Sequence, residues 1–238
     1  MKIRAKVKPE GAQGIFLFCL ENQTRLSRLG EQVARISGGI KRLFKLGFKA
    51  REGEAELVLL HQAPWQVAVL IGLGKKEKLT SESFRRAVGA GVRRIKKYAL
   101  KSLEVEIFEP GIRVLGKEEV ARALAEGFWF SCYQYQEYQE RESKFPQQIF
   151  LVGETKGLKS VLERAEALGG EHQYIRDLIN RPGGDLGPEE FAQQAKEAWL
   201  EKFRLRLGKI TVRNGALTFT DNSCLLYTSP SPRDLSTS

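Results

Sequence analysis

The chain has 238 residues, of which 42% are hydrophobic, and it carries a formal net charge of +10. This length allows one large domain, or one ordinary domain and part of a second. The three cysteines, Cys19, Cys132 and Cys224, lie far apart, which argues against a disulfide scaffold or a zinc module and is typical of a reducing cytoplasm. No run approaches the ~20 apolar residues that cross a bilayer, so we expect a cytoplasmic protein with no membrane partner.

Five apolar runs predict β-strands in the first two thirds of the chain, at residues 14–20, 55–60, 67–73, 103–108 and 148–153. Three of the runs are nearly continuous rather than alternating, which is typical of strands that are buried on both faces. Apolar residues at helical spacing lie between strands, at 84–99 and 120–131. Strands interleaved with helices predict an α/β domain over residues 1–153.

Residues 154–181 predict a long connecting helix. Apolar residues from Leu158 to Ile179 recur at helical spacing, and Pro182 follows the expected end of the helix. About 25 residues at a rise of ~1.5 Å would span roughly 37 Å. Gly169 and Gly170 stand in the middle, and each costs about 1 kcal/mol of helix propensity, so we expect a bend or a break there.

A second, incomplete α/β domain is expected over residues 182–222. Pro188 suits the first position of a helix, and Glu189 and Glu190 complement the helix dipole. Residues 209–213 predict a strand. The last sixteen residues contain five Ser, two Thr and two Pro, a composition that does not form a core. They also resemble translated sequencing-adapter sequence, so we expect residues 223–238 to be a disordered, non-native tail.

Few residues could carry catalysis. The chain has two histidines, His61 and His172, and no aspartate precedes Asp177. Two-metal hydrolytic sites need several converging carboxylates, so we expect no metal site within 1–153. No GxSxG motif is present. Residues 70–80 lack the third glycine of a dinucleotide loop and the hydroxyl residue of a Walker loop, and we interpret them as a strand-to-helix turn.

The positive charge is concentrated between Lys75 and Lys101, where ten basic residues stand against Glu77 and Glu82, a net charge of +8. Six cations on a predicted helix over 81–101 could follow a phosphate backbone: Arg85, Arg86, Arg93, Arg94, Lys96 and Lys97. DNA is therefore a candidate partner of these residues. The alternatives are a solvated basic face and a subunit contact.

Three stretches resemble the leucine aminopeptidase (cytosol aminopeptidase) family. Residues 67–97 are similar to the strand, GLGK turn and helix of its N-terminal domain, and residues 123–138 are similar to the helix that follows. Residues 174–196 resemble the family's RDLxNxPxNxLxPexxA signature. The residues that keep its register are Arg176, Asp177, Leu178, Asn180, Pro182, Leu186 and Pro188. Two residues depart from the signature: Gly184 stands where Asn is usual, and Gly187 stands where a capping Thr or Ser is common.

The resemblance implies a macro-domain-like N-terminal domain, with a mainly parallel mixed sheet flanked by helices, joined by a long helix to a metallopeptidase domain. The family removes N-terminal residues from peptides, using two divalent metals (Zn, Mn or Mg) that activate a bridging water. Its GKGxxFDxGG-like and NTDAEGR-like ligand motifs do not occur here. We therefore expect a truncated, inactive fragment that binds no metal and contains no catalytic residue. The family also implies a homo-hexamer.

Two other functions stay open. Some bacterial members of the family also bind DNA, so the chain could be an accessory module that acts through the basic helix 81–101. A stand-alone ligand-binding domain, for ADP-ribose for example, is suggested only by the macro-like fold. No loop motif in the sequence supports that second alternative.

Overall fold

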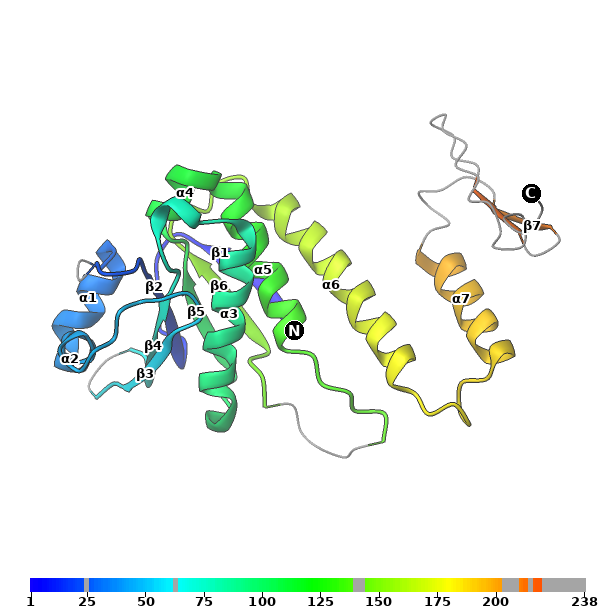
Figure 1. The fold of residues 1–238 in the computed structure, drawn as a ribbon, viewed down its shortest axis with the longest axis horizontal. Coiled ribbons are helices and arrows are strands. Elements are labelled where there is room, and N and C mark those ends of the chain that lie inside the picture. Colours follow the sequence, from blue (N-terminus) through cyan, green and yellow to red (C-terminus); the bar gives the residue numbers. More distant parts are fainter. Residues whose placement is uncertain (24–25, 62–63, 139–143, 203–209, 214–215, 220–238) are drawn as a thin grey trace, which may run out of the picture. The chain divides into compact units, whose positions relative to one another are not determined.

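The computed structural model describes residues 1–23, 26–61, 64–138, 144–202, 210–213 and 216–219 (Figure 1). The chain divides into two compact units, Met1–Asp177 and Leu178–Ser238, which we describe separately. The predicted tail over 223–238 lies outside the described residues. The domain boundaries placed at 153 and 181 stay predictions.

The first unit is built on a six-stranded sheet in the order β1-β6-β5-β2-β4-β3. Its strands are β1 (Lys2–Lys6), β2 (Gly14–Cys19), β3 (Ala55–Leu59), β4 (Val67–Gly72), β5 (Ser102–Glu106) and β6 (Gln148–Val152). All neighbouring strands are parallel except β3 and β4, which are antiparallel. The expected α/β class with a mainly parallel sheet is confirmed.

Helices cover both faces of the sheet (Figure 1). Ile15 and Leu17 of β2 pack in one cluster with residues of α1 (Arg28–Ile36) and α2 (Gly38–Lys45). Phe16 and Phe18 point to the other face, into the cluster that contains residues of α3 (Ser81–Ile95) and α5 (Lys117–Ser131). Both β2 and β4 are buried along their whole length, as their continuous apolar runs predicted.

Four elements of this unit were not predicted: β1, α1, α2 and α4 (Glu109–Leu115). The strand β1 alternates charged and apolar residues, and it forms by pairing with β6, which lies far along the chain. The helix α1 begins after Ser27, whose side chain accepts a hydrogen bond from the Gly30 backbone N–H at 3.0 Å. Such a cap satisfies one of the free N–H groups at the start of a helix.

The stretch 70–80 is a strand-to-helix turn, as interpreted. The strand β4 ends at Gly72, where an added Cβ would lie 2.2 Å from the Arg51 carbonyl oxygen. A close approach of two backbone segments therefore explains this glycine, without a phosphate. Thr80 then caps α3, because its Oγ1 accepts from the Ser83 N–H at 3.3 Å.

The predicted basic helix over 81–101 is too long. The helix α3 ends at Ile95, and a 3₁₀ turn at Lys96–Tyr98 follows. Ala99 then adopts the left-handed conformation, with φ of 48°. A residue in that region cannot continue a right-handed helix, so Lys96 and Lys97 lie on the turn and not on α3.

The helix α6 (Lys159–Asn180) runs without interruption, so the predicted break at the glycine pair is wrong, whereas a bend there stays a prediction. Gly169 lies against α5: a Cβ there would stand 2.2 Å from Cγ of Trp129. Gly170 faces open space, with no atom within 4 Å of an added Cβ. Packing of α6 against the Trp129 indole therefore outweighs the low helix propensity of the two glycines.

The neighbouring glycines provide a matched test of this packing. We expect Gly169→Ala to lower the free energy of unfolding by about 1–3 kcal/mol, because its methyl group overlaps the Trp129 side chain. Gly170→Ala should instead raise it by about 0.5–1 kcal/mol, through helix propensity. Urea denaturation of the two variants measures both values. Equal effects of the two substitutions would contradict the close contact.

Two residues of the signature hold α6 against the end of α5. The Tyr133 hydroxyl donates to Oδ1 of Asp177 at 2.9 Å, and Arg176 donates from Nη1 to the Phe130 carbonyl at 3.1 Å. The Arg176 guanidinium also lies 3.9 Å from the centre of the Tyr133 ring, a cation–π contact. These signature residues therefore anchor a helix.

The second unit contains α7 (Pro188–Lys202) and a hairpin of β7 (Ile210–Arg213) and β8 (Ala216–Phe219). Pro188 is the first residue of α7, and β7 lies where a strand was predicted. Before α7, the Asp185 N–H donates to the Pro182 carbonyl at 2.9 Å, which closes a turn. That a second α/β domain begins here stays a prediction.

Candidate functional site: a charged network between α3 and α5

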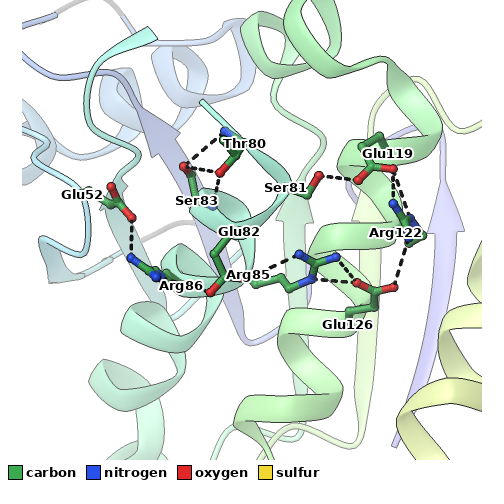
Figure 2. A network of polar contacts seen from close by, with 10 residues as sticks. All are labelled: Glu52, Thr80, Ser81, Glu82, Ser83, Arg85, Arg86, Glu119, Arg122 and Glu126. Atoms are coloured by element: carbon green, nitrogen blue, oxygen red, sulfur yellow. Dashed lines mark hydrogen bonds and ion pairs between the residues drawn. The ribbon is translucent and has the colours of Figure 1, made fainter. Parts of the chain in front are cut away.

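Small residues let α3 and α5 approach each other closely. A Cβ at Gly127 of α5 would lie 2.9 Å from Cβ of Val88 and 3.1 Å from Cα of Arg85, both in α3. Charged side chains of both helices meet beside this contact, and Figure 2 shows them.

The centre of the network is the carboxylate of Glu126, whose side chain is only 5% exposed. Arg85 donates to its Oε2 from Nε at 2.7 Å, and Nη2 lies 2.6 Å from the same oxygen (Figure 2). Arg122 Nη1 is 3.9 Å from Oε1. A buried carboxylate is costly without a charged partner, and Arg85 is the principal partner here.

Other charges extend the network towards the surface. Glu119 accepts hydrogen bonds from Arg122 and from the Ser81 hydroxyl. The Arg122 bond, followed by that of Ser81, lowers the pKa of Glu119, and Glu119 in turn raises the pKa of Arg122. Arg86 pairs with Glu82 at 3.1 Å and with Glu52 at 3.4 Å. These outer pairs are largely solvated, and such pairs contribute little to stability.

The six predicted cations do not form one free basic face. Arg85 and Arg86 belong to the network, and Arg94 donates to Glu56 of β3 at 2.9 Å and to the Ala55 carbonyl. The remaining three are exposed and form no ion pair with a residue that the structure describes: Arg93, Lys96 and Lys97. Lys96 and Lys97 lie 5.6 Å and 5.1 Å from the ring centres of Phe145 and Tyr98. Contact with DNA stays a prediction.

A surface hollow of about 920 Å³ lies beside the network. Its charged lining residues are Glu52, Glu82, Arg85, Arg86, Arg93, Arg122 and Glu126. Across the described part of the chain, no three His, Cys, Asp or Glu side chains gather in a way that could hold a metal ion. The side chains that line this hollow offer charged groups of both signs.

The described cysteines are not activated nucleophiles. Burial raises the pKa of Cys132 to about 12, and burial followed by the nearby Glu106 raises the pKa of Cys19 still further. A thiol must ionise to act as a nucleophile. Both side chains therefore stay protonated at neutral pH, as expected for thiols that only fill space in a core.

The sequence prediction missed Glu126 and Arg122. A signal for them was present, because Glu126 is the one charged residue in the apolar run at 123–130, and Glu119, Arg122 and Glu126 recur at spacings of three and four. Residues at those spacings share a helix face. A charged residue on the buried face of a helix needs a partner, but the sequence did not indicate which one.

The same fold occurs in solved structures of other proteins. A mutant of tomato leucine aminopeptidase has a TM-score of 0.72 at 16% identity, over 89% of this chain and 44% of that chain. The bottromycin maturation enzyme BotP has a TM-score of 0.61 at 22% identity, over 86% of this chain and 40% of that chain. The first unit is therefore an α/β domain of the type found in leucine aminopeptidases.

A family model gives the more specific assignment. Residues 15–142 match the N-terminal domain of the cytosol aminopeptidase family, and this region contains β2 to α5 and the charged network. The chain belongs to the cytosol aminopeptidase family. The predicted resemblance to this family is thereby confirmed.

Curated relatives agree with this assignment. The probable cytosol aminopeptidase of Alkaliphilus metalliredigens (strain QYMF) is 31% identical over 159 residues, which is 63% of this chain and 31% of that protein. That of Aquifex aeolicus (strain VF5) is 29% identical over 206 residues, which is 83% of this chain and 40% of that protein. The chain thus spans about a third of the length of the curated relatives it matches. None of the described helices has the length and apolar character required to span a membrane.

Proposed function

We propose that this chain is the N-terminal fragment of a two-metal leucyl aminopeptidase, an enzyme that removes N-terminal residues from peptides. The match of residues 15–142 to the N-terminal domain of the family carries the proposal. Arg176 and Asp177 of the signature, which hold α6 to α5, support it further. In this proposal the chain contributes a folded domain and a connecting helix, and it is inactive alone.

The metals belong to the proposed whole enzyme, with Zn, Mn or Mg as the candidates. Such ions would supply an activated water and polarise the scissile carbonyl. The residues that the structure describes do not fit a two-metal site, because no cluster of three potential ligands occurs among them. We therefore assign no step of peptide hydrolysis to a residue of this chain.

The proposed partners and location also follow the family. We expect peptide substrates, a homo-hexameric assembly and a cytoplasmic location for the whole enzyme. For this chain, the macro-domain-like character of the first unit is part of the same proposal. A mainly parallel sheet with helices on both faces, which the first unit has, is compatible with it.

An activity assay tests the proposal that this chain is inactive by itself. We expect the purified 238-residue chain to hydrolyse L-leucine p-nitroanilide no faster than Mn²⁺ or Zn²⁺ alone, because no described residues form a metal site. The release of p-nitroaniline, followed by absorbance, measures the rate. A full-length relative assayed in the same buffer is the positive control. Metal-dependent turnover by the chain itself would overturn the proposal that it is an inactive fragment.

A further inference from the structure

A second hollow, of about 700 Å³, lies at the carboxyl ends of three neighbouring parallel strands. Lys8 follows β1, Glu106 ends β5, and Gly153 follows β6. Ser27 and Arg28, at the start of α1, complete the wall on the side of β2. The hollow does not share a lining residue with the charged network.

The strand order makes this place a switch point of the sheet. From β2 the chain proceeds through α1 and α2 to β3 and β4 on one side, whereas from β5 it proceeds to β6 on the other side. The connections that leave β2 and β5 therefore diverge and open a crevice at their carboxyl ends. Ligands of open α/β sheets bind in such crevices.

Glu106 places a buried carboxyl group in the wall of the hollow. The residue is only 6% exposed, and its Oε2 accepts no hydrogen bond from a residue that the structure describes. Glu104, two residues earlier on β5, is as buried but satisfied: Trp65 Nε1 donates to it at 2.5 Å and the Glu10 N–H at 2.7 Å. A buried acceptor without a donor is costly and needs an explanation. A ligand that donates to the exposed part of the Glu106 carboxyl group would offset part of this cost.

The surroundings keep part of the Glu106 carboxyl protonated near neutral pH. Burial raises its pKa to about 7, and the nearby Glu109 adds to the rise, while hydrogen bonds from the Ser27 side chain and the Phe18 backbone offset part of it. A positively charged donor in the hollow would favour the ionised form. The carboxyl group therefore suits a cationic ligand group.

The rim of the hollow has the opposite charge. Lys8 and Arg28 are exposed, and neither forms an ion pair with a described residue. The two acidic residues at the rim are already paired, Glu109 with Arg113 and Glu154 with Lys117. The groups left to a ligand are thus a buried carboxylate on the inside and two cations on the outside. The polar residues Ser27 and Gln32 also line the hollow, and its apolar lining residues include Pro9, Leu29, Ile107, Ile112 and Val152.

We propose that this hollow binds a free α-amino acid with an apolar side chain. Its ammonium group donates to the Glu106 carboxylate, its carboxylate pairs with Arg28 and Lys8, and its side chain contacts the apolar lining. A zwitterion satisfies both ends at once, whereas an amine or an acid alone satisfies one. The site uses no residue of the proposed peptidase chemistry, so it stands whether or not the whole enzyme is a peptidase.

Calorimetric titration of the 238-residue chain with three compounds tests the two charged ends separately. L-leucine carries both charges, L-leucinamide lacks the carboxylate, and N-acetyl-L-leucine lacks the ammonium group. We expect L-leucine to bind at least about tenfold more tightly than either analogue, because charged hydrogen bonds are the strong ones. Equal binding of L-leucine and L-leucinamide would overturn the zwitterion and indicate an amine site. No heat of binding up to about 10 mM L-leucine would overturn the proposal altogether.

Two variants connect the binding to the named residues. We expect Glu106→Gln to weaken L-leucine binding by about tenfold and Arg28→Gln by about fivefold, because each removes one charged partner. The matched controls are Glu118→Gln and Arg35→Gln, which are exposed and do not line the hollow. Arg28 is exposed, so its variant stays informative if Glu106→Gln fails to fold. Binding that is unchanged in both Glu106→Gln and Arg28→Gln would contradict the assignment.

The pH dependence of binding provides a further readout. We expect the affinity for L-leucine to rise roughly tenfold from pH 6 to pH 8, because the bound ammonium group requires ionised Glu106. The other titratable or charged groups that face this carboxyl or line the hollow are Cys19, Lys8, Arg28, Glu109 and Glu154. Glu106→Gln separates their contribution, since the rise should disappear in that variant alone. A rise that persists in Glu106→Gln would overturn the role of Glu106.

Discussion

Replacing Glu106 with glutamine should remove a pH dependence from the stability of the first unit. Burial raises the pKa of Glu106 from 4.5 to about 7 in the folded chain. Between these two values the folded chain holds a proton that the unfolded chain has lost, so the free energy of unfolding falls as the pH rises. The difference of about 2.5 units corresponds to roughly 3 kcal/mol, lost between about pH 4.5 and pH 7. Stability should be insensitive to this group below and above that window.

Urea denaturation at several pH values from 5 to 8, followed by tryptophan fluorescence, measures this effect. Trp65 and Trp129, both in the first unit, report its unfolding. The free energy of unfolding of the wild type should fall relative to that of Glu106→Gln as the pH rises, because the neutral glutamine resembles the protonated carboxyl and does not titrate. The curve of Glu118→Gln should stay parallel to that of the wild type. Parallel curves for the wild type and Glu106→Gln would show that the Glu106 carboxyl has an ordinary pKa in the folded chain.

Removing the side chain of Arg85 should destabilise the first unit far more than removing that of its neighbour Arg86. The side chain of Arg85 is 24% exposed and pairs with Glu126, which is 5% exposed. Loss of one partner of a buried pair costs about 3–5 kcal/mol, and partial solvation of Arg85 reduces this to about 2–3 kcal/mol. The side chain of Arg86 is 64% exposed and its partners are solvated, so Arg86→Ala should cost at most about 1 kcal/mol.

The two alanine variants form a matched pair, and urea denaturation at pH 7 compares them. A double variant separates lost charge from lost packing: Glu126→Gln in the Arg85→Ala background should recover about 1 kcal/mol or more, because it removes the uncompensated buried charge. Equal destabilisation by Arg85→Ala and Arg86→Ala would show that the Glu126 pair is not energetically special. If the double variant is no more stable than Arg85→Ala, the loss of stability in Arg85→Ala comes from lost packing and not from the uncompensated charge.

The difference between buried and exposed arginines on α3 also affects any test of DNA binding. Arg85 pairs with a buried carboxylate, so its substitution would confuse loss of folding with loss of a phosphate contact. Arg93, Lys96 and Lys97 are exposed and form no ion pair with a described residue. Variants of these three residues would test the predicted DNA contact without disturbing the contact between α3 and α5.

The parts of the fold that the sequence predicted are those with strong local patterns. The central strands β2 and β4 are recognisable because burial on both faces leaves their apolar runs continuous. The edge strand β1 was missed because its charged, half-exposed residues do not resemble a strand until β6 pairs with it. The break expected at the glycine pair was wrong for a related reason, because the contact of Gly169 with Trp129 is not visible in the helix's own sequence.

The candidate sites were predicted only in part. The concentration of positive charge on α3 was visible in the sequence, but the partner of Arg85 lies 41 residues away on another helix. Glu104 and Glu106 stand two apart in a predicted strand, which places them on the same face. That signal could have indicated polar chemistry at the sheet. It could not show that Glu104 finds donors in Trp65 and Glu10 whereas Oε2 of Glu106 finds none among the described residues.

The amino-acid sequence by itself determined the family, the α/β class and most of the buried strands, because short-range apolar periodicity and a local signature are sufficient for these features. Only the tertiary structure decided which charges are neutralised and which remain available. Burial and pairing depend on residues that are distant in the chain, as for Glu126 with Arg85. The hollow at Glu106 likewise exists only after the ends of β1, β5 and β6 and the start of α1 have come together, which is a property of the strand order.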